Sequence, residues 1–215
     1  MSSTWLGARR SALQQLPTGD QGAPCIIWGL DGKFSKQEIG TRVTVTARLA
    51  SEKDVDSIVR ICSDGWRATY APLLSGSAIE DVISRYYNPT RVADEIKPDP
   101  PGWLGWIIAS DEDGVVGAVG AGGLTTENTG EVFVLYADVE LRYSGFGSAV
   151  LRFMTDQQEK LGATEQWVSV AKGNELGLPF YRSRGFSYVT DVQSWDGTGS
   201  DEGFINVRMK RSLPR

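Results

Sequence analysis

Apolar residues alternate with polar ones in some segments of the chain and recur every three or four positions in others. Alternation indicates strands, whereas the longer spacing indicates helices with one buried face. The first pattern, together with short apolar runs, predicts strands near 43–47, 106–109, 115–124, 131–137, 167–171, 186–192 and 204–209. The second predicts helices around 52–66, 79–83, 150–161 and 176–182. Strands and helices in this order predict a mixed α/β sheet without a regular βαβ alternation.

Four local signals mark where these elements begin and end. Ser51 and Asp54 have the spacing of a capping box at the start of the first helix. The pair Asn88-Pro89 is expected to close the second helix, and Gly162 to end the third. Residues 111–114, Asp-Glu-Asp-Gly, predict a hairpin turn between two strands.

Residues 1–43 differ from the rest of the chain. They are rich in Gly, Gln, Ser and Thr and show no sustained period of apolar residues. We therefore predict an N-terminal extension with little structure of its own, followed by one domain over residues 44–215. A domain of that length buries a core without disulfide or metal staples.

The composition removes whole classes of chemistry. The chain contains no histidine, which excludes Ser-His-Asp and Cys-His catalytic sites and every zinc site with a histidine ligand. Its two cysteines are too few for an all-thiolate zinc site, so no metal is expected. Acid–base chemistry must therefore use carboxylates, Tyr, Lys, Cys or bound water.

The charge balance and the apolar runs bear on partners and location. Lys and Arg number 22 against 27 for Asp and Glu, a net charge of −5, which argues against a nucleic-acid partner. There is no apolar run of about 18 residues that could span a membrane. Arg9 and Arg10 are not followed by the apolar stretch of a signal peptide. We expect a cytoplasmic protein without a membrane partner, either a monomer or a homodimer.

The segment with the clearest chemistry runs from Arg142 to Ala149, between an apolar strand and an amphipathic helix. Its glycines and the helix start suit a phosphate group, because backbone N–H groups there are unpaired. The segment lacks the lysine of a P-loop. Val150 stands where a dinucleotide fingerprint needs its third glycine, although Glu165 follows at a suitable distance. A plain glycine-containing turn before a helix is the structural alternative.

This segment resembles the acetyl-CoA-binding signature of the GNAT superfamily of N-acetyltransferases, Arg-x-x-Gly-x-Gly after a strand. Leu135–Asp138 resembles the family's preceding strand end, with Ala137 where a valine is commoner. Asn174 followed by Phe180–Phe186 resembles its second characteristic region. The resemblance covers about residues 43–211. It implies a mixed, mostly antiparallel sheet of about six to seven strands, with a parallel, splayed central pair and four flanking helices.

The resemblance also implies acetyl-CoA as the co-substrate. Backbone N–H groups at the helix start would hold its pyrophosphate, and the preceding strand would pair with its pantetheine arm by strand addition. The N–H of Ala137 would face the thioester oxygen as an oxyanion donor. The predicted cofactor-binding residues are Leu135, Tyr136, Ala137, Arg142, Ser144, Gly145, Phe146, Gly147, Ser148 and Asn174.

Two residues are candidates for proton transfer. Glu131 matches the position of the catalytic glutamate in histone-type members, and a period of two would place it on one face with Phe133, Leu135 and Ala137. Its alternatives are a solvated residue at a strand end and a base supplied by ordered water. Tyr181 aligns with the tyrosine that protonates the leaving thiolate in several members. Its alternative is an aromatic side chain that packs against the cofactor.

The implied function is N-acetyl transfer from acetyl-CoA to a primary amine of a small molecule or a protein, by direct attack in a ternary complex. A catalytically silent acyl-CoA-binding regulatory module and a dinucleotide-binding domain are the alternatives. Trp66, Tyr70, Trp103 and Trp106 are candidates for the acceptor pocket or the core. Cys62 falls on the apolar face of a helix and is expected in the core.

Overall fold

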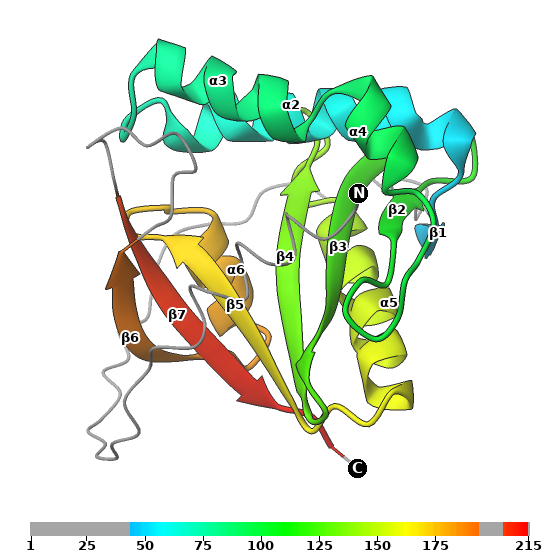
Figure 1. Cartoon of the computed structure of the whole chain (residues 1–215), viewed down its shortest axis with the longest axis vertical. Coiled ribbons are helices and arrows are strands. Elements are labelled where there is room, and N and C mark those ends of the chain that lie inside the picture. The colour runs from blue at the N-terminus through cyan, green and yellow to red at the C-terminus, as the bar shows by residue number, and fades with distance from the viewer. Residues whose placement is uncertain (1–43, 194–203, 215) are drawn as a thin grey trace, which may run out of the picture. The chain divides into compact units, whose positions relative to one another are not determined.

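The computed structural model describes residues 44–193 and 204–214, and the predicted extension over residues 1–43 lies outside them. The described residues form a seven-stranded sheet in the order β1-β2-β3-β4-β5-β7-β6 (Figure 1). The strands are β1 (Thr46–Leu49), β2 (Trp106–Ser110), β3 (Val116–Thr126), β4 (Thr129–Ala137), β5 (Glu165–Ala171), β6 (Ser187–Gln193) and β7 (Ile205–Ser212). The helices are η1 (Glu52–Asp54), α2 (Val55–Tyr70), α3 (Gly76–Tyr86), α4 (Pro89–Asp94), α5 (Phe146–Lys160) and α6 (Gly177–Arg182).

All neighbouring strands are antiparallel except the central pair, β4 and β5. These two strands pair only over Thr129–Val132 and Glu165–Val168. Beyond that stretch they diverge, and Figure 1 shows them as a V that opens toward α2. The predicted fold class, mostly antiparallel with a parallel, splayed central pair, is confirmed.

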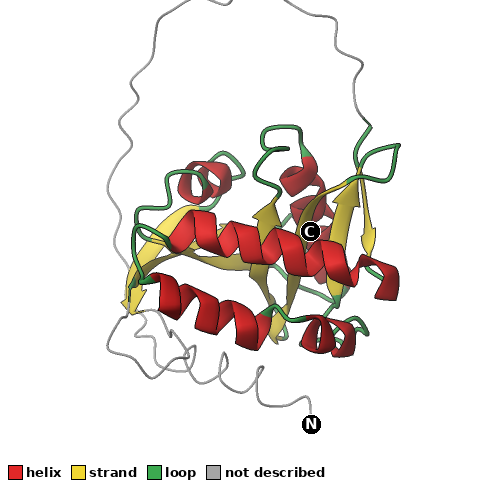
Figure 2. Cartoon of the chain, turned by 90° about the horizontal axis from the view of Figure 1, so that it is seen from above, coloured by secondary structure: helices red, strands yellow, loops and turns green. Residues whose placement is uncertain are grey.

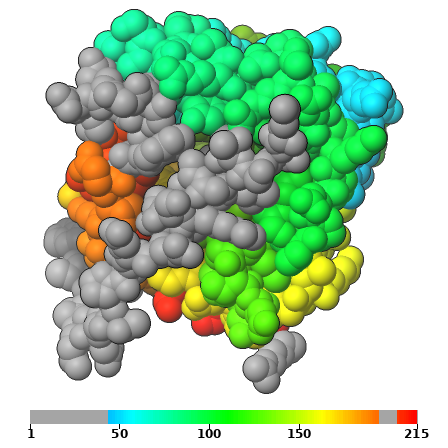
Figure 3. Space-filling view, in the orientation of Figure 1, coloured from blue at the N-terminus to red at the C-terminus, as the bar shows by residue number. Residues whose placement is uncertain are grey.

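Helices cover both faces of the sheet (Figure 2). Helix α5 packs on β1 to β4, and α2 packs on β3 and β4 from the other side. In the space-filling view, α2, α3 and α4 form a continuous surface along the top of the domain (Figure 3). Of the helices in the described residues, none combines the length and the apolar character needed to cross a membrane.

The residues predicted to begin and end helices do so, and Asn88 also begins a helix that was not predicted. Ser51 and Asp54 form the capping box, and Gly162 follows α5 with a φ of 96°, which glycine adopts without strain. Asn88 ends one helix and also begins another, since its side chain accepts a hydrogen bond from the N–H of Arg91 in α4. The short α4 was not predicted, because Asn88-Pro89 serves as a start signal as readily as a stop signal.

A β-bulge interrupts β4 at Phe133. Ala121 of β3 pairs with Val134, but the next residue, Gly122, pairs with Val132, so Phe133 has no opposite residue. An extra residue in one strand of an antiparallel pair shifts every later side chain to the other face. The period-two pattern of β4 therefore holds on each side of Phe133 but not across it.

The bulge overturns the predicted common face of β4. Gly120, which pairs with Leu135, faces α5, because a Cβ on it would lie 2.6 Å from a valine side chain of that helix. Gly123, which pairs with Glu131, faces the opposite way, where its Cβ would lie 3.2 Å from the ring of Phe133. Directly paired residues share a face, so Glu131 and Phe133 lie opposite to Leu135. The prediction of one shared face was wrong.

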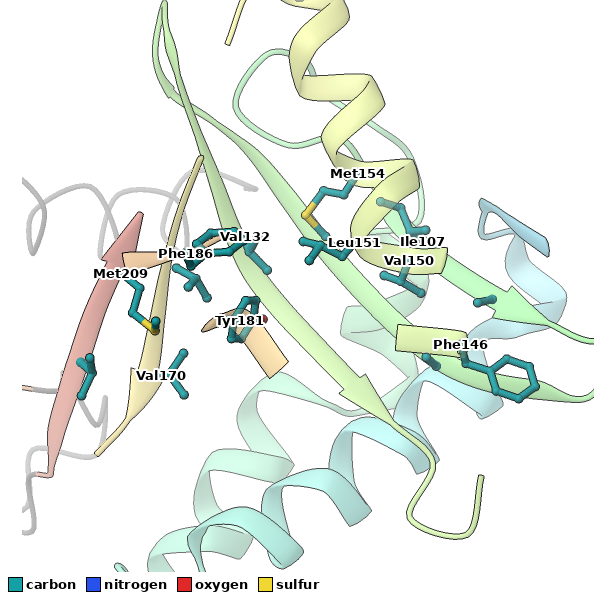
Figure 4. Packing of buried hydrophobic residues seen from close by; sticks show 14 residues of the cluster. Ile107, Val132, Phe146, Val150, Leu151, Met154, Val170, Tyr181, Phe186 and Met209 are labelled. Atoms are coloured by element: carbon teal, nitrogen blue, oxygen red, sulfur yellow. The ribbon is translucent and has the colours of Figure 1, made fainter. Parts of the chain in front are cut away.

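The buried core spans both arms of the V. Figure 4 shows Met154 and Ile107 on one side of β4 and Val170 and Met209 on the other, with Tyr181 between the arms. Burial also assigns three of the residues for which the sequence suggested a place in the core. Trp103 and Trp106 are buried, and Cys62 is fully buried on α2, which confirms it as a core residue.

Candidate active site

A cavity of ≈ 620 Å³ occupies the opening of the V. Its described walls come from the edge of β4 beyond its pairing with β5, the facing part of β5, the end of α2, the start of α5, and α6. Nine of the ten predicted cofactor residues line it, the exception being Ser144, which is exposed beside it. Tyr181 also lines the cavity, whereas Glu131 does not.

The start of α5 is built to present backbone N–H groups. Gly145 caps the helix with a φ of 91° and contributes no side-chain bond. The first bond of the helix ladder runs from the N–H of Ala149 to the carbonyl of Gly145, so the N–H groups of Phe146, Gly147 and Ser148 precede the ladder. The ring of Phe146 is buried and packs on Gly117 of β3, which anchors this turn. The site therefore offers amide donors and the positive end of a 15-residue helix to an anion.

A cation that the sequence did not single out adjoins this helix start. The guanidinium of Arg184 donates to the hydroxyl of Ser148 in the first turn of α5 and to the carbonyl of Phe180 at 2.8 Å. It lies over the ring of Phe180, 3.7 Å from its centroid. Burial lowers the pKa of Arg184, and a cation at the positive end of a helix is unfavourable unless an anion joins it. The signal in the sequence that could have identified Arg184 is its position within the Phe-Tyr-x-x-x-Gly-Phe region.

The backbone of β4 points an N–H group into the cavity. The N–H of Asp138 donates to the carbonyl of Gly117 in β3, at 2.9 Å. Successive residues of a strand point their N–H groups to opposite edges, so the N–H of Ala137 points away from β3 toward the opening. This is the orientation that the predicted oxyanion donor requires.

Asn174 lies between the end of β5 and α6 and shapes the turn that joins them. Its side-chain oxygen accepts hydrogen bonds from the N–H groups of Leu176 and Gly177, at 3.2 and 2.7 Å. The oxygen is therefore occupied by the turn, and the NH2 group of Asn174 is the part that a molecule in the cavity can use.

Tyr181 projects from α6 into the space between the two arms. Its ring packs edge-on against Phe180 and Phe186, with centroids 5.1 and 5.2 Å away. The side chain is buried although it lines the cavity. Burial, and secondarily the nearby Tyr70, raise the pKa of the Tyr181 phenol, so it remains a proton donor at neutral pH.

Glu131 is held in an ion pair at the closed base of the V. Both of its oxygens accept hydrogen bonds from the guanidinium of Arg208, at 2.5 and 3.0 Å, and both side chains are buried. The same guanidinium donates to the hydroxyl of Ser169, at 2.9 Å, and lies over the ring of Trp167. Of these four residues only Ser169 lines the cavity. The pairing was not predictable, because Arg208 is 77 residues away in sequence.

The wall on the α2 side is aromatic. Tyr70 lines the cavity together with Phe133 and Tyr136, and Trp66 stacks on Tyr70 with ring centroids 4.1 Å apart. Burial raises the pKa of Tyr136, and its hydroxyl shares a hydrogen bond with that of Tyr70. Of the four aromatic candidates for the acceptor pocket, Tyr70 lies in the wall and Trp66 directly behind it.

The sequence of this chain is similar to those of known acetyltransferases. A sequence model of the acetyltransferase (GNAT) family matches residues 70–186, which include β4, the start of α5 and Tyr181. A spermidine N(1)-acetyltransferase of Thermoplasma acidophilum is 23% identical over 157 residues, covering 73% of this chain and 94% of that protein.

Solved structures share the fold at low sequence identity. The PaiA N-acetyltransferase of Thermoplasma acidophilum, in complex with coenzyme A, has a TM-score of 0.64 and 22% identity, and the match covers 79% of this chain and 99% of that one. Ard1 of Thermoplasma volcanium has a TM-score of 0.58 and 18% identity, with 80% and 99% covered.

Proposed function

The chain belongs to the acetyltransferase (GNAT) family, and we propose that it moves the acetyl group of acetyl-CoA to a primary amine by direct attack in a ternary complex. The observation that carries the proposal is a single cavity that contains helix-start amides, a free strand edge and Tyr181. Acetyl-CoA has a pyrophosphate, an extended pantetheine arm and a thioester, and these fit the helix-start amides, the strand edge and Tyr181 in that order. The aromatic wall of the cavity is then available to the acceptor.

Binding of acetyl-CoA would use the main chain first. The amides of Phe146, Gly147 and Ser148 face the pyrophosphate, and Arg142 and Arg184 add positive charge at the same end. The pantetheine arm would extend along the free edge of β4 as an added strand. Asn174 would hold the arm from the opposite wall through its NH2 group.

The acetyl transfer needs one bond to form and one to break. The amine nitrogen attacks the thioester carbonyl carbon, and the N–H of Ala137 stabilises the oxyanion, an effect worth about 3 kcal/mol for a donor of this kind. The carbon–sulfur bond then breaks. Tyr181 donates its proton to the leaving thiolate and is reprotonated from solvent. The nitrogen loses its second proton to ordered water as the amide forms, and the acetylated amine is released.

The proton of the attacking ammonium has two routes, Glu131 or ordered water. A proton taken by Glu131 would have to pass Ser169 and would disrupt the two hydrogen bonds to Arg208. These contacts favour the water route, with Glu131 holding Arg208 and Ser169 at the cavity wall. Glu131 as the base stays a prediction that its glutamine variant tests.

The test is release of coenzyme A thiol from acetyl-CoA in the presence of a panel of amines, including a polyamine because the Thermoplasma relative is named a spermidine acetyltransferase. We expect release that depends on both acetyl-CoA and an amine, with one acetylated amine per thiol by mass spectrometry. Full binding of acetyl-CoA without release for any amine in the panel would refute the proposal.

A further inference from the structure

The positively charged residues of the described cavity lining gather at one end. Among the lining residues in the described part of the chain, the charged ones are Arg142, Glu175 and Arg184. Arg142 precedes α5, Glu175 lies in the turn into α6, and Arg184 is bound to the first turn of α5. The two cations therefore lie at the phosphate-binding end of the cavity, and Glu175 lies next to Asn174 in the opposite wall.

The other end is neutral and aromatic. We call it the aromatic end, and its lining residues are Thr69, Tyr70, Phe133, Tyr136 and Ser169. More rings stand behind it. The ring of Phe204 lies 5.0 Å from that of Tyr70, the ring of Tyr87 lies 6.5 Å from that of Tyr136, and Trp103 stacks on Phe133 with an interplanar angle of 4°. The hydroxyl groups are the polar groups that these side chains present.

Three carboxylates on the described elements around this end are paired. Glu131 is bound by Arg208, and the carboxylate of Asp138, which follows β4, is 2.6 Å from Arg60. Asp64 of α2 is 3.3 Å from Arg67. Each of these three carboxylates therefore faces a guanidinium.

We propose that the aromatic end selects a monoamine with an aromatic or apolar body and rejects polyamines. This assignment rests on the proposed acetyl transfer and names its acceptor class. A second ammonium group of a polyamine would be taken out of water against a wall whose described residues include no carboxylate, which is costly. An aromatic body would instead stack on Tyr70 and Phe133.

The same wall favours loss of the proton from the single ammonium that must react. Removal of an ammonium from water into an apolar environment favours its neutral form, which is the nucleophile. The hydroxyl groups of Tyr70 and Ser169 are placed to receive the neutral amine by hydrogen bonding. A site of this kind needs no dedicated carboxylate base, in agreement with the engagement of Glu131 by Arg208.

The experiment compares kcat/KM for 2-phenylethylamine and spermidine with the full-length protein and saturating acetyl-CoA. We expect 2-phenylethylamine to be favoured by about 10-fold or more, the discrimination that a mismatched pocket typically supplies. Thr69→Asp adds a carboxylate to the aromatic end and should shift the ratio toward spermidine by about 10-fold. Thr126→Asp is the matched control, because it adds the same charge to an exposed residue outside the lining and should leave the ratio unchanged.

The results separate this assignment from the proposed function. A ratio near one, or a preference for spermidine, would overturn the assignment while thiol release upheld the acetyl transfer. Equal shifts in Thr69→Asp and Thr126→Asp would also overturn it, since the overall charge and not the wall would then set the preference. Absence of release with every amine, with acetyl-CoA still bound, would overturn both proposals.

Discussion

The two ends of the β4–β5 junction are held by different kinds of contact. At the closed end, Thr129–Val132 pair with Glu165–Val168, and a buried glutamine pair ties the junction to α5. The side-chain NH2 of Gln158 donates to the carbonyl of Glu131 at 2.9 Å, and that of Gln166 donates to Gln158 at 2.7 Å. The polar groups named here are therefore paired with other groups of the protein.

At the open end the polar groups face a cavity. The free edge of β4 over residues 135–137 and the amides of 146–148 lack the side-chain cross-links of the closed end. Backbone groups that the described part of the protein does not pair are costly for folding and useful for binding. The comparison predicts that substitutions at the closed end reduce stability, whereas substitutions at the open end reduce binding or turnover.

The largest effect is expected from Arg208→Met at the closed end. It would leave the buried carboxylate of Glu131 without its partner, which typically costs about 3–5 kcal/mol in the free energy of unfolding. Urea denaturation measures this loss, and the double variant Arg208→Met with Glu131→Gln should recover part of it. The matched control is Arg67→Met, whose ion pair with Glu80 is exposed, so its loss should change the free energy of unfolding far less. Equal losses of stability in Arg208→Met and Arg67→Met would show that the buried ion pair contributes no more than the exposed one.

Tyr181→Phe is expected to have the largest effect at the open end. It removes the phenol proton but keeps the ring that packs on Phe180 and Phe186. We expect kcat to fall on the order of 100-fold, with little change in the KM for acetyl-CoA or in the melting temperature. Tyr188→Phe, on the exposed side of β6, is the matched control. A parallel loss of cofactor affinity and kcat would indicate that Tyr181 only packs against the cofactor.

A smaller effect is expected from Arg184→Leu, which removes a cation from the phosphate-binding end. The loss of one charge-assisted contact should raise the KM for acetyl-CoA about 10-fold and leave kcat nearly unchanged. Arg182→Leu, at the last residue of α6, is the matched control, because Arg182 is exposed and outside the lining; it should change neither. A KM unchanged in Arg184→Leu would mean that its contacts with Ser148 and Phe180 serve only the fold.

These residues also show how far the sequence alone could lead. The strands and the main helices followed from periodicity and local signals, and the nine lining residues from motifs that resemble those of the GNAT family, because both depend on neighbours in the chain. The bulge at Phe133 and the pair of Glu131 with Arg208 did not. An extra residue in a strand leaves no mark in composition, and the partner on β7 is brought to Glu131 only by the folded sheet.

The smallest effect on activity is expected from Glu131→Gln. Glu131 belongs to the closed end by its contacts, yet its sequence position predicts a base. If water takes the proton, Glu131→Gln should lower stability but leave the shape of the pH dependence of kcat/KM unchanged, since no titrating group of the reaction is removed. Glu165→Gln is the matched control, because Glu165 is also a closed-end carboxylate outside the cavity and pairs with Lys210 at 3.3 Å. Loss of the acidic limb in Glu131→Gln alone would identify Glu131 as the base. Proton transfer would then pass through Ser169, and the closed end would take part in the chemistry as well as in the fold.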